Sequence, residues 1–142
     1  MARVQIEFPE PPLCRTETTV RISDINYGGH LGHDALISIL HDARFRFFRH
    51  FGMDEADTDG CGLMIADLAI RYEAEAFHGQ TLGVEISAGD VRSRGCDLIY
   101  RVTDPESGRT IALARTGVVF LDLEKKQVTA IPERFLAVIR GT

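Results

Sequence analysis

The chain has 142 residues, of which 44% are apolar and 26% are charged. This length suits one ordinary domain, so we expect residues 1–142 to form a single domain with an extended lead-in at residues 1–15. The formal net charge is -5 and the basic residues are scattered along the chain, which argues against binding to a nucleic-acid backbone. A smaller anionic ligand needs only a local basic cluster, and the net charge does not decide for or against one.

The cysteines indicate the compartment. Cys14, Cys61 and Cys96 are widely spaced and form no CxxC or Cys/His pairing, so they predict neither a zinc site nor a disulfide framework. The first fifteen residues contain acidic side chains and three prolines where a signal peptide would have an apolar core, and no stretch is long and apolar enough for a membrane span. We therefore expect a cytoplasmic protein without a membrane partner.

The first half of the chain predicts a strand, a loop and one long helix. Apolar and polar side chains alternate over residues 16–23, as in a strand. Glycines then predict an ordered irregular loop over residues 24–33. Residues 34–51 form the only long helix that the sequence predicts, with Gly52 as its C-terminal cap. Its apolar stripe has helical spacing and consists of Leu36, Ile39, Leu40, Ala43 and Phe47.

The second half predicts four more strands and the fold class. The strands are expected at residues 63–75, 81–92, 97–103 and 110–123, and a short helix is expected after Pro132. Their short connections favour antiparallel neighbours, which gives an α+β domain with one helix packed on a five-stranded antiparallel sheet. One helix covers only part of a sheet face, so we expect the remaining apolar surface to form a homodimer or homotetramer interface.

Two motifs carry a family resemblance. Residues 23–34 read Ser-Asp-Ile-Asn-Tyr-Gly-Gly-His-Leu-Gly-His-Asp, and residues 40–44 read Leu-His-Asp-Ala-Arg. Their order resembles the 4-hydroxybenzoyl-CoA thioesterase family, whose members read Asp-x-Asp, then Gly-His-Val-Asn-Asn, then an acidic-Ala-Arg signature on the central helix. The resemblance implies the hotdog fold, in which the sheet wraps a long central helix. It also implies hydrolysis of an acyl-CoA thioester at a subunit interface, without a metal or redox cofactor.

The catalytic acid is where this sequence departs from the family. The second acid of the Asp-x-Asp motif is replaced by Asn26, and an amide cannot act as a base. Asp24 keeps the first acid as an alternative, although two residues away on an extended segment it points to the opposite face. A second hotdog subgroup uses a loop amide, a His near the helix start and an acid nine positions later. Asn26, His33 and Asp42 match that arrangement, which makes Asp42 the leading candidate.

Other candidate site residues lie in the loop, at the helix start and near a strand end. His30 matches the His of the family motif, either as a catalytic residue or as a loop-packing one. Backbone N–H groups of His33 and Asp34 at the helix start could stabilise an oxyanion, although either side chain could simply cap the helix. Asp42 could instead pair with Arg46 four residues later on an exposed helix face. Glu73 and Glu75, near a strand end, receive no role.

A basic turn is the candidate for binding CoA. Arg92, Ser93 and Arg94 lie at a strand end where relatives often contact the nucleotide, and guanidinium groups suit phosphates by geometry. Solvated turn arginines are the alternative. Two functions stay open at this stage: an acyl-CoA thioesterase, and a non-hydrolytic module that binds acyl-CoA or an acyl carrier on the same scaffold. The acyl group itself is also open.

Overall fold

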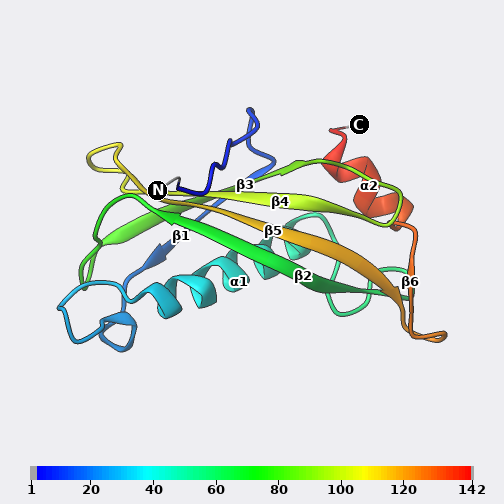
Figure 1. The fold of residues 1–142 in the computed structure, drawn as a ribbon, viewed down its shortest axis with the longest axis horizontal. Coiled ribbons are helices and arrows are strands. Elements are labelled where there is room, and N and C mark those ends of the chain that lie inside the picture. The colour runs from blue at the N-terminus through cyan, green and yellow to red at the C-terminus, as the bar shows by residue number, and fades with distance from the viewer. Residues whose placement is uncertain (1–2, 142) are drawn as a thin grey trace.

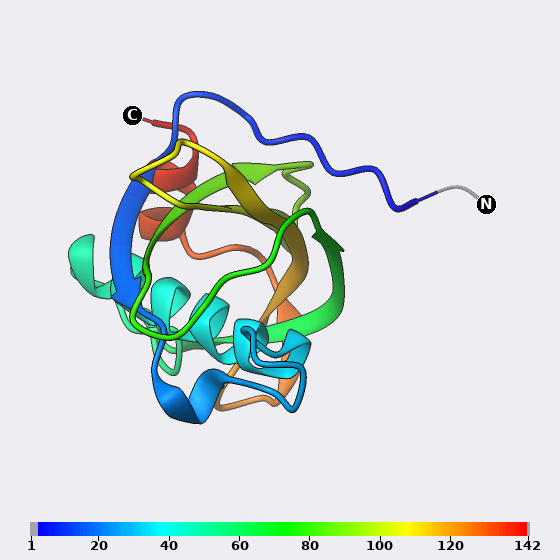
Figure 2. The ribbon, with the colours of Figure 1, turned by 90° about the vertical axis from the view of Figure 1, so that its left-hand side faces the viewer.

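One antiparallel sheet curls around one long helix in the computed structural model, which describes residues 3–141 (Figures 1 and 2). The strand order is β1-β3-β4-β5-β2, and β6 pairs with β5. The predicted α+β class, with one long helix on an antiparallel sheet, is confirmed. In chain order the elements are β1 (Cys14–Thr19), the 3-10 turn η1 (Ile22–Asp24), α1 (His33–His50), β2 (Cys61–Tyr72), β3 (Thr81–Gly89), β4 (Gly95–Thr103), β5 (Thr110–Asp122), β6 (Gln127–Thr129) and α2 (Glu133–Ile139).

Most element boundaries shift by a few residues from the predicted ones, and two departures change the fold itself. The five predicted strands correspond to β1–β5, and the short strand β6 is an addition that the sequence did not predict. The predicted first strand, residues 16–23, ends at Thr19. It ends early because the Asp24 carboxylate accepts a hydrogen bond from the backbone N–H of Arg21 at 2.8 Å and draws the chain into η1. Alternating polarity continues through this turn and therefore does not reveal it.

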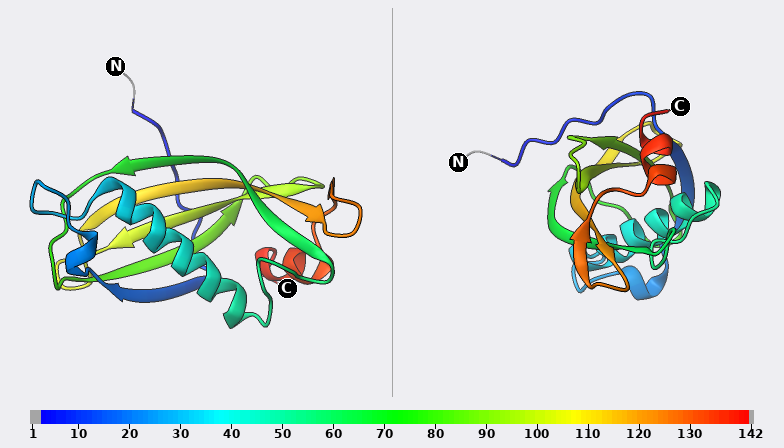
Figure 3. Two further views of the ribbon diagram at one scale, coloured as in Figure 1. Left: turned by 90° about the horizontal axis from the view of Figure 1, so that it is seen from below. Right: turned by 90° about the vertical axis from the view of Figure 1, so that its right-hand side faces the viewer.

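The core lies between α1 and the concave face of the sheet (Figure 3). The predicted apolar stripe of the helix is buried. Phe47 of this stripe and the neighbouring Phe48 both contact Phe135 of α2, and the Phe48 and Phe135 rings stack with centroids 5.2 Å apart. The largest fully buried sheet side chains are Tyr100, Phe120, Leu82, Ile86, Leu98 and Val84. No helix in residues 3–141 has both the length and the apolar composition needed to cross a membrane.

An ionic network lies inside this core. Arg44, the arginine of the acidic-Ala-Arg motif, is only 7% exposed. Its Nε donates to the Glu55 carboxylate at 2.7 Å and its Nη1 to the Tyr100 hydroxyl at 3.3 Å. Burial raises the pKa of the Tyr100 phenol, so the hydroxyl stays neutral, and it shares a hydrogen bond with Thr116 at 2.8 Å. The motif arginine thus joins α1 to the loop before β2 and to β4.

The outer face of the sheet and its β2 edge differ in what covers them. The N-terminal segment runs over the outer side of the sheet (Figure 2). The guanidinium of Arg101 is 4.2 Å from the ring centroid of Phe8 in this segment. Strand β2 forms one edge of the sheet. Within residues 3–141, only the beginning of β2 has hydrogen-bond partners on this outer edge, where the N–H of Leu63 donates to the carbonyl of Glu55 at 2.8 Å. Its exposed apolar side chains are Met64, Ile65, Leu68 and Tyr72.

The antiparallel register gives the sheet two distinct ends. Tyr72 of β2 lies opposite Ala112 of β5 at the end where α1 begins. Cys61 lies opposite Asp122 at the end where α1 stops and α2 packs (Figure 1). The β3–β4 turn belongs to this second end, because Gly89 pairs with Asp97.

Candidate active site

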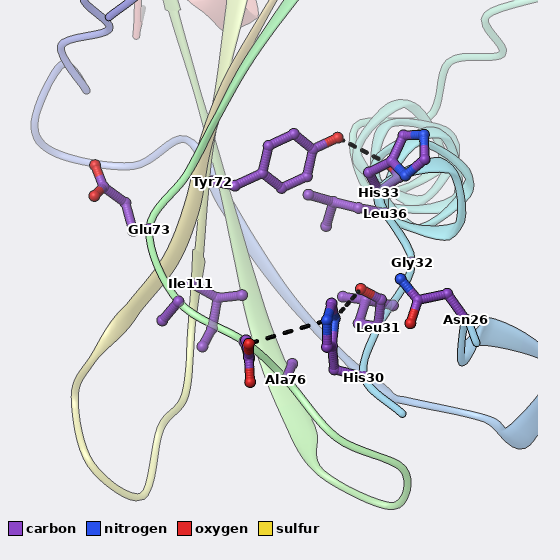
Figure 4. Close-up of a pocket in the computed structure, with 12 residues that line it drawn as sticks. Asn26, His30, Leu31, Gly32, His33, Leu36, Tyr72, Glu73, Ala76 and Ile111 are labelled. Atoms are coloured by element: carbon purple, nitrogen blue, oxygen red, sulfur yellow. Dashed lines mark hydrogen bonds and ion pairs between the residues drawn. The ribbon is translucent and has the colours of Figure 1, made fainter. Parts of the chain in front are cut away.

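A cavity of about 340 Å³ opens between the start of α1 and the end of β2 (Figure 4). Apolar side chains and a few convergent polar groups share its wall, a combination typical of small-molecule sites. The lining residues are Asn26, His30, Leu31, Gly32, His33, Leu36, Tyr72, Glu73, Ala74, Glu75, Ala76 and Ile111. Three of the predicted catalytic residues, Asn26, His30 and His33, are therefore brought together by the fold.

Asn26 is oriented by its own loop. Its side-chain Oδ1 accepts a hydrogen bond from the Gly28 N–H at 2.9 Å, and its backbone N–H donates to the carbonyl of His30 at 2.9 Å. Because an N–H can only donate, the oxygen of the amide must face Gly28 and the NH₂ group points elsewhere. No acceptor for these two N–H donors occurs among residues 3–141 in the hydrogen bonds of the structure. Asn26 is thus available as a donor to a ligand oxygen.

His30 is held in one orientation. Its Nδ1 lies 3.2 Å from the carbonyl oxygen of Leu31, and since a carbonyl can only accept, Nδ1 carries the hydrogen in this arrangement. The neutral ring then presents Nε2 as an unprotonated nitrogen. Nε2 lies 3.9 Å from Oε1 of Glu75, at the rim of the cavity.

The start of α1 supplies backbone donors. Its N-cap is Gly32 and no side chain caps it, so the alternative in which His33 or Asp34 caps the helix is not found. The first turn of a helix leaves N–H groups free and favours negative charge. The Tyr72 hydroxyl donates to the carbonyl of His33 at 3.0 Å and ties this turn to β2. Burial, and secondarily the nearby Asp34, raise the pKa of Tyr72, which keeps it a donor.

Asp42 lies elsewhere on the helix. Its carboxylate pairs with Arg46 at 3.1 Å, as in the alternative considered above, and its side chain is 58% exposed. Arg46 also donates to the carbonyl of Glu17 in β1 at 2.8 Å. Asp42 therefore faces β1, on the side of α1 away from the cavity.

Asp24 shares that location. It is 6% exposed and bonded to Arg21. Burial by itself would raise the pKa of the Asp24 carboxyl, but the hydrogen bonds and charge of Arg21 outweigh burial and hold the pKa below its ordinary value. A carboxylate with a depressed pKa is a weaker base. Asp24 and Asp42 line a second hollow of about 260 Å³ together with Thr18, Arg21, Ser38 and Ile39.

The basic turn lies at the other end of the sheet. Arg92 pairs with Asp90 at 2.5 Å, and the carbonyl of Ser93 accepts from the N–H of Ile131 at 3.0 Å. The Arg94 side chain is exposed. The length of β3, at about 3.3 Å per residue, puts roughly 30 Å between this turn and the cavity of the same chain.

Sequence reasoning missed one side of the cavity. Glu73 and Glu75 follow Tyr72, and their alternation with alanine is what a half-exposed strand also shows. The structure ends β2 at Tyr72 and turns the next residues toward the helix start. Glu73 pairs with Arg71 at 2.7 Å, whereas Glu75 faces His30. The available signal in the sequence was a pair of acids separated by one alanine, Glu73 and Glu75, near the end of a predicted strand.

Metal ligands and cysteine thiols are two further kinds of reactive group. Among residues 3–141 no group of three or more His, Cys, Asp or Glu side chains is arranged to hold a metal ion. No cysteine lines the cavity. Burial raises the pKa of the Cys96 thiol to about 12, so this thiol is not a nucleophile near neutral pH.

Known proteins share this fold. A Synechocystis protein named as a candidate esterase, sll0410, is 26% identical over 105 residues, and the match spans 72% of this chain but 63% of that protein. The structure of Slr0204, a 1,4-dihydroxy-2-naphthoyl-CoA thioesterase from Synechocystis, has a TM-score of 0.81 at 19% identity and covers 89% of this chain and 94% of that chain. SAV2348 from Staphylococcus aureus, solved in complex with CoA, has a TM-score of 0.81 at 19% identity. This match covers 89% of this chain and 81% of that chain.

The comparisons confirm the predicted hotdog thioesterase resemblance at the level of the family. The two solved structures, at these identities, establish the fold. The sequence match to the thioesterase-like superfamily extends over residues 20–139, which include the cavity, the central helix and every strand except β1. The chain belongs to the thioesterase-like superfamily.

Proposed function

We propose that this protein hydrolyses an acyl-CoA thioester to a free acid and CoA in the cavity at the start of α1. The observation that carries the proposal is the convergence of the Asn26 amide, the His30 ring and the first turn of α1 on one largely apolar cavity. Thioester hydrolysis requires an activated water and donors placed where the oxyanion develops. Slr0204 is an acyl-CoA thioesterase and SAV2348 binds CoA, which supports this ligand class.

Each part of the cavity has a role in this reaction. The thioester oxygen lies against the Asn26 NH₂ group and the N–H groups of His33 and Asp34, where the helix dipole also favours negative charge. The acyl group contacts the apolar wall formed by Leu31, Leu36, Ala76 and Ile111.

The second part of the proposal is a dimer formed through the outer edge of β2. An exposed edge strand with apolar side chains pairs readily with another strand. In an antiparallel pair of β2 strands, the Cys61 end of one subunit lies beside the Tyr72 end of the other. The β3–β4 turn of the second subunit then comes to the end of the sheet where the first subunit has its cavity. Its Arg92, Ser93 and Arg94 are placed there for the phosphates of CoA.

The dimer predicts a specific effect of a charge on β2. Light scattering should give the wild-type protein the mass of a dimer or tetramer. Leu68→Asp should lower this mass to that of a monomer and reduce turnover at least tenfold. Leu68 is 40% exposed and Val128, on β6, is 43% exposed. Val128→Asp is therefore a matched control that should keep the wild-type mass. A wild-type mass of one chain at all concentrations would contradict the interface.

The activity itself is tested by a substrate screen. Short-chain, long-chain and aromatic acyl-CoAs are incubated with the protein, and free thiol is measured over time. Multiple turnovers with at least one class are expected. Calorimetric binding of acyl-CoA without release of thiol would instead favour the non-hydrolytic module. Parallel assays with acyl carrier protein thioesters decide between the two carriers.

The catalytic acid predicted from the sequence is Asp42, and this prediction has its own test. Under that hypothesis a second subunit must supply it to the cavity, and Asp42→Asn should lower kcat by about 100-fold. The free energy of unfolding should fall by only about 0.5 kcal/mol, because the lost ion pair with Arg46 is an exposed one. Unchanged turnover would exclude Asp42 as the acid. Asp24→Asn, measured beside it, tests the alternative acid in the same way.

A further inference from the structure

The ring of His30 is fixed by two layers of backbone contacts. Its Nδ1 bonds the carbonyl of Leu31, and the N–H of Leu31 in turn donates to the carbonyl of Ala76 at 2.8 Å. Leu31 also forms an isolated β-bridge with Ile25. A Cβ added at Gly28 would come within 3.2 Å of Nε2, so the loop leaves little room on that side of the ring. In the neutral ring Nε2 is therefore the nitrogen without a hydrogen, and the loop holds it at the cavity wall.

Glu75 is the carboxylate that faces this nitrogen. Its Oε1 lies 3.9 Å from Nε2 of His30, too far for a direct hydrogen bond but close enough for electrostatic stabilisation of a charged ring. The other cavity carboxylate, Glu73, is paired with Arg71. Within residues 3–141 the ion pairs of the structure give Glu75 no arginine or lysine partner. The remaining titratable side chains around the cavity are His33 and Tyr72.

We propose that His30 is the general base of the reaction and that Glu75 stabilises its protonated form. The inference rests on the proposed thioesterase function and names the base of that same site. It replaces the carboxylate base expected from the sequence with a histidine–carboxylate pair inside the cavity. Asp42 and Asp24 lie in the other hollow, and each carboxylate is engaged by an arginine.

The proposed reaction consumes only the thioester and one water molecule. Water attacks the thioester carbonyl, its oxygen bonds to carbon, and one of its protons passes to Nε2 of His30. The resulting oxyanion accepts hydrogen bonds from Asn26 and the first turn of α1. When the carbon–sulfur bond breaks, the imidazolium returns the proton to the departing thiolate. The products are a carboxylic acid and the CoA thiol, and Glu75 remains ionised throughout.

The test compares His30→Gln with Glu75→Gln on the full-length protein, using the best acyl-CoA from the screen. His30→Gln should lower kcat at least 100-fold with KM changed less than threefold. Glu75→Gln should lower kcat about tenfold and move the acid limb of the pH–rate profile to lower pH. The limb moves in this direction because an imidazolium without its carboxylate neighbour loses its proton more readily, so the ring stays neutral in more acidic solution.

Two exposed residues outside the cavity lining serve as matched controls. His78→Gln, on the turn after Ala76, and Glu106→Gln, on the β4–β5 turn, should keep the wild-type rate and pH profile. Circular dichroism and light scattering confirm that each variant keeps its fold and mass.

Each remaining outcome counts against the inference. A wild-type level of hydrolysis by His30→Gln would overturn it and leave the thioesterase proposal standing. A larger loss in Glu75→Gln than in His30→Gln would make Glu75 the base and would also overturn it. A large loss confined to Asp42→Asn would return the role to the helix acid. No thiol release by the wild-type protein from any acyl-CoA would overturn both proposals.

Discussion

Asn26→Asp should lower kcat near neutral pH by about 100-fold or more, because the proposed oxyanion-hole donor is replaced by a negative charge. The two side chains have nearly the same volume, and a carboxylate can still accept the hydrogen bond from Gly28 that orients position 26. What is lost is the pair of amide N–H donors, which in the proposed reaction act on the transition state rather than on the bound substrate. The loss should therefore fall on kcat more than on KM.

The measurement is steady-state hydrolysis across pH, with Asn26→Ala for comparison. Alanine removes the donors without adding charge, so it should be impaired less than aspartate at neutral pH. As the pH falls and the new carboxyl protonates, the gap between the two variants should narrow. A clear gain of hydrolysis in Asn26→Asp, with the oligomer intact, would contradict the oxyanion role. It would indicate instead a binding module that had lost the usual acid of the family.

Arg44→Met should lower the free energy of unfolding by about 3–5 kcal/mol, the usual effect of leaving one partner of a buried ion pair alone. Methionine keeps the length of the side chain and fills the site, so the lost packing is small. The cost comes from Glu55, which is 14% exposed and loses its bond of 2.7 Å to the guanidinium. Among the ion pairs within residues 3–141, Glu55 then keeps only the one with His41, at 3.1 Å, which is charged when that ring is protonated.

Urea unfolding measures this change, and two further variants test its cause. Arg49→Met, on the exposed side of the same helix, removes a cation–π contact with Phe45 at 5.2 Å and should cost less than about 1 kcal/mol. The double variant Arg44→Met/Glu55→Gln should recover part of the loss, because the unpaired charge is gone. A single variant as stable as the wild type would show that the buried network does not stabilise the fold.

The main helix and strands could be predicted from the amino-acid sequence, because their apolar periodicities are local. Apolar spacing predicted the helix at residues 34–51, and the structure has it at His33–His50. The segments that form β2 to β5 were identified for the same reason. Asn26, His30 and His33 lie together at the cavity because one short glycine-containing loop carries all three to the helix start. Contacts within eight residues of chain need no knowledge of the rest of the fold.

Which groups face these three residues depends on packing between segments that are distant in the sequence. Nine helical positions at about 100° each turn Asp42 half-way round the helix from His33, which puts it on the side that faces β1. Glu75 reaches His30 only because β2 ends opposite the first turn of α1, and that depends on the register of β2 against β5. The same register puts the arginine turn at the far end of the sheet. Pairing between strands distant in sequence sets such positions, and no local pattern encodes it.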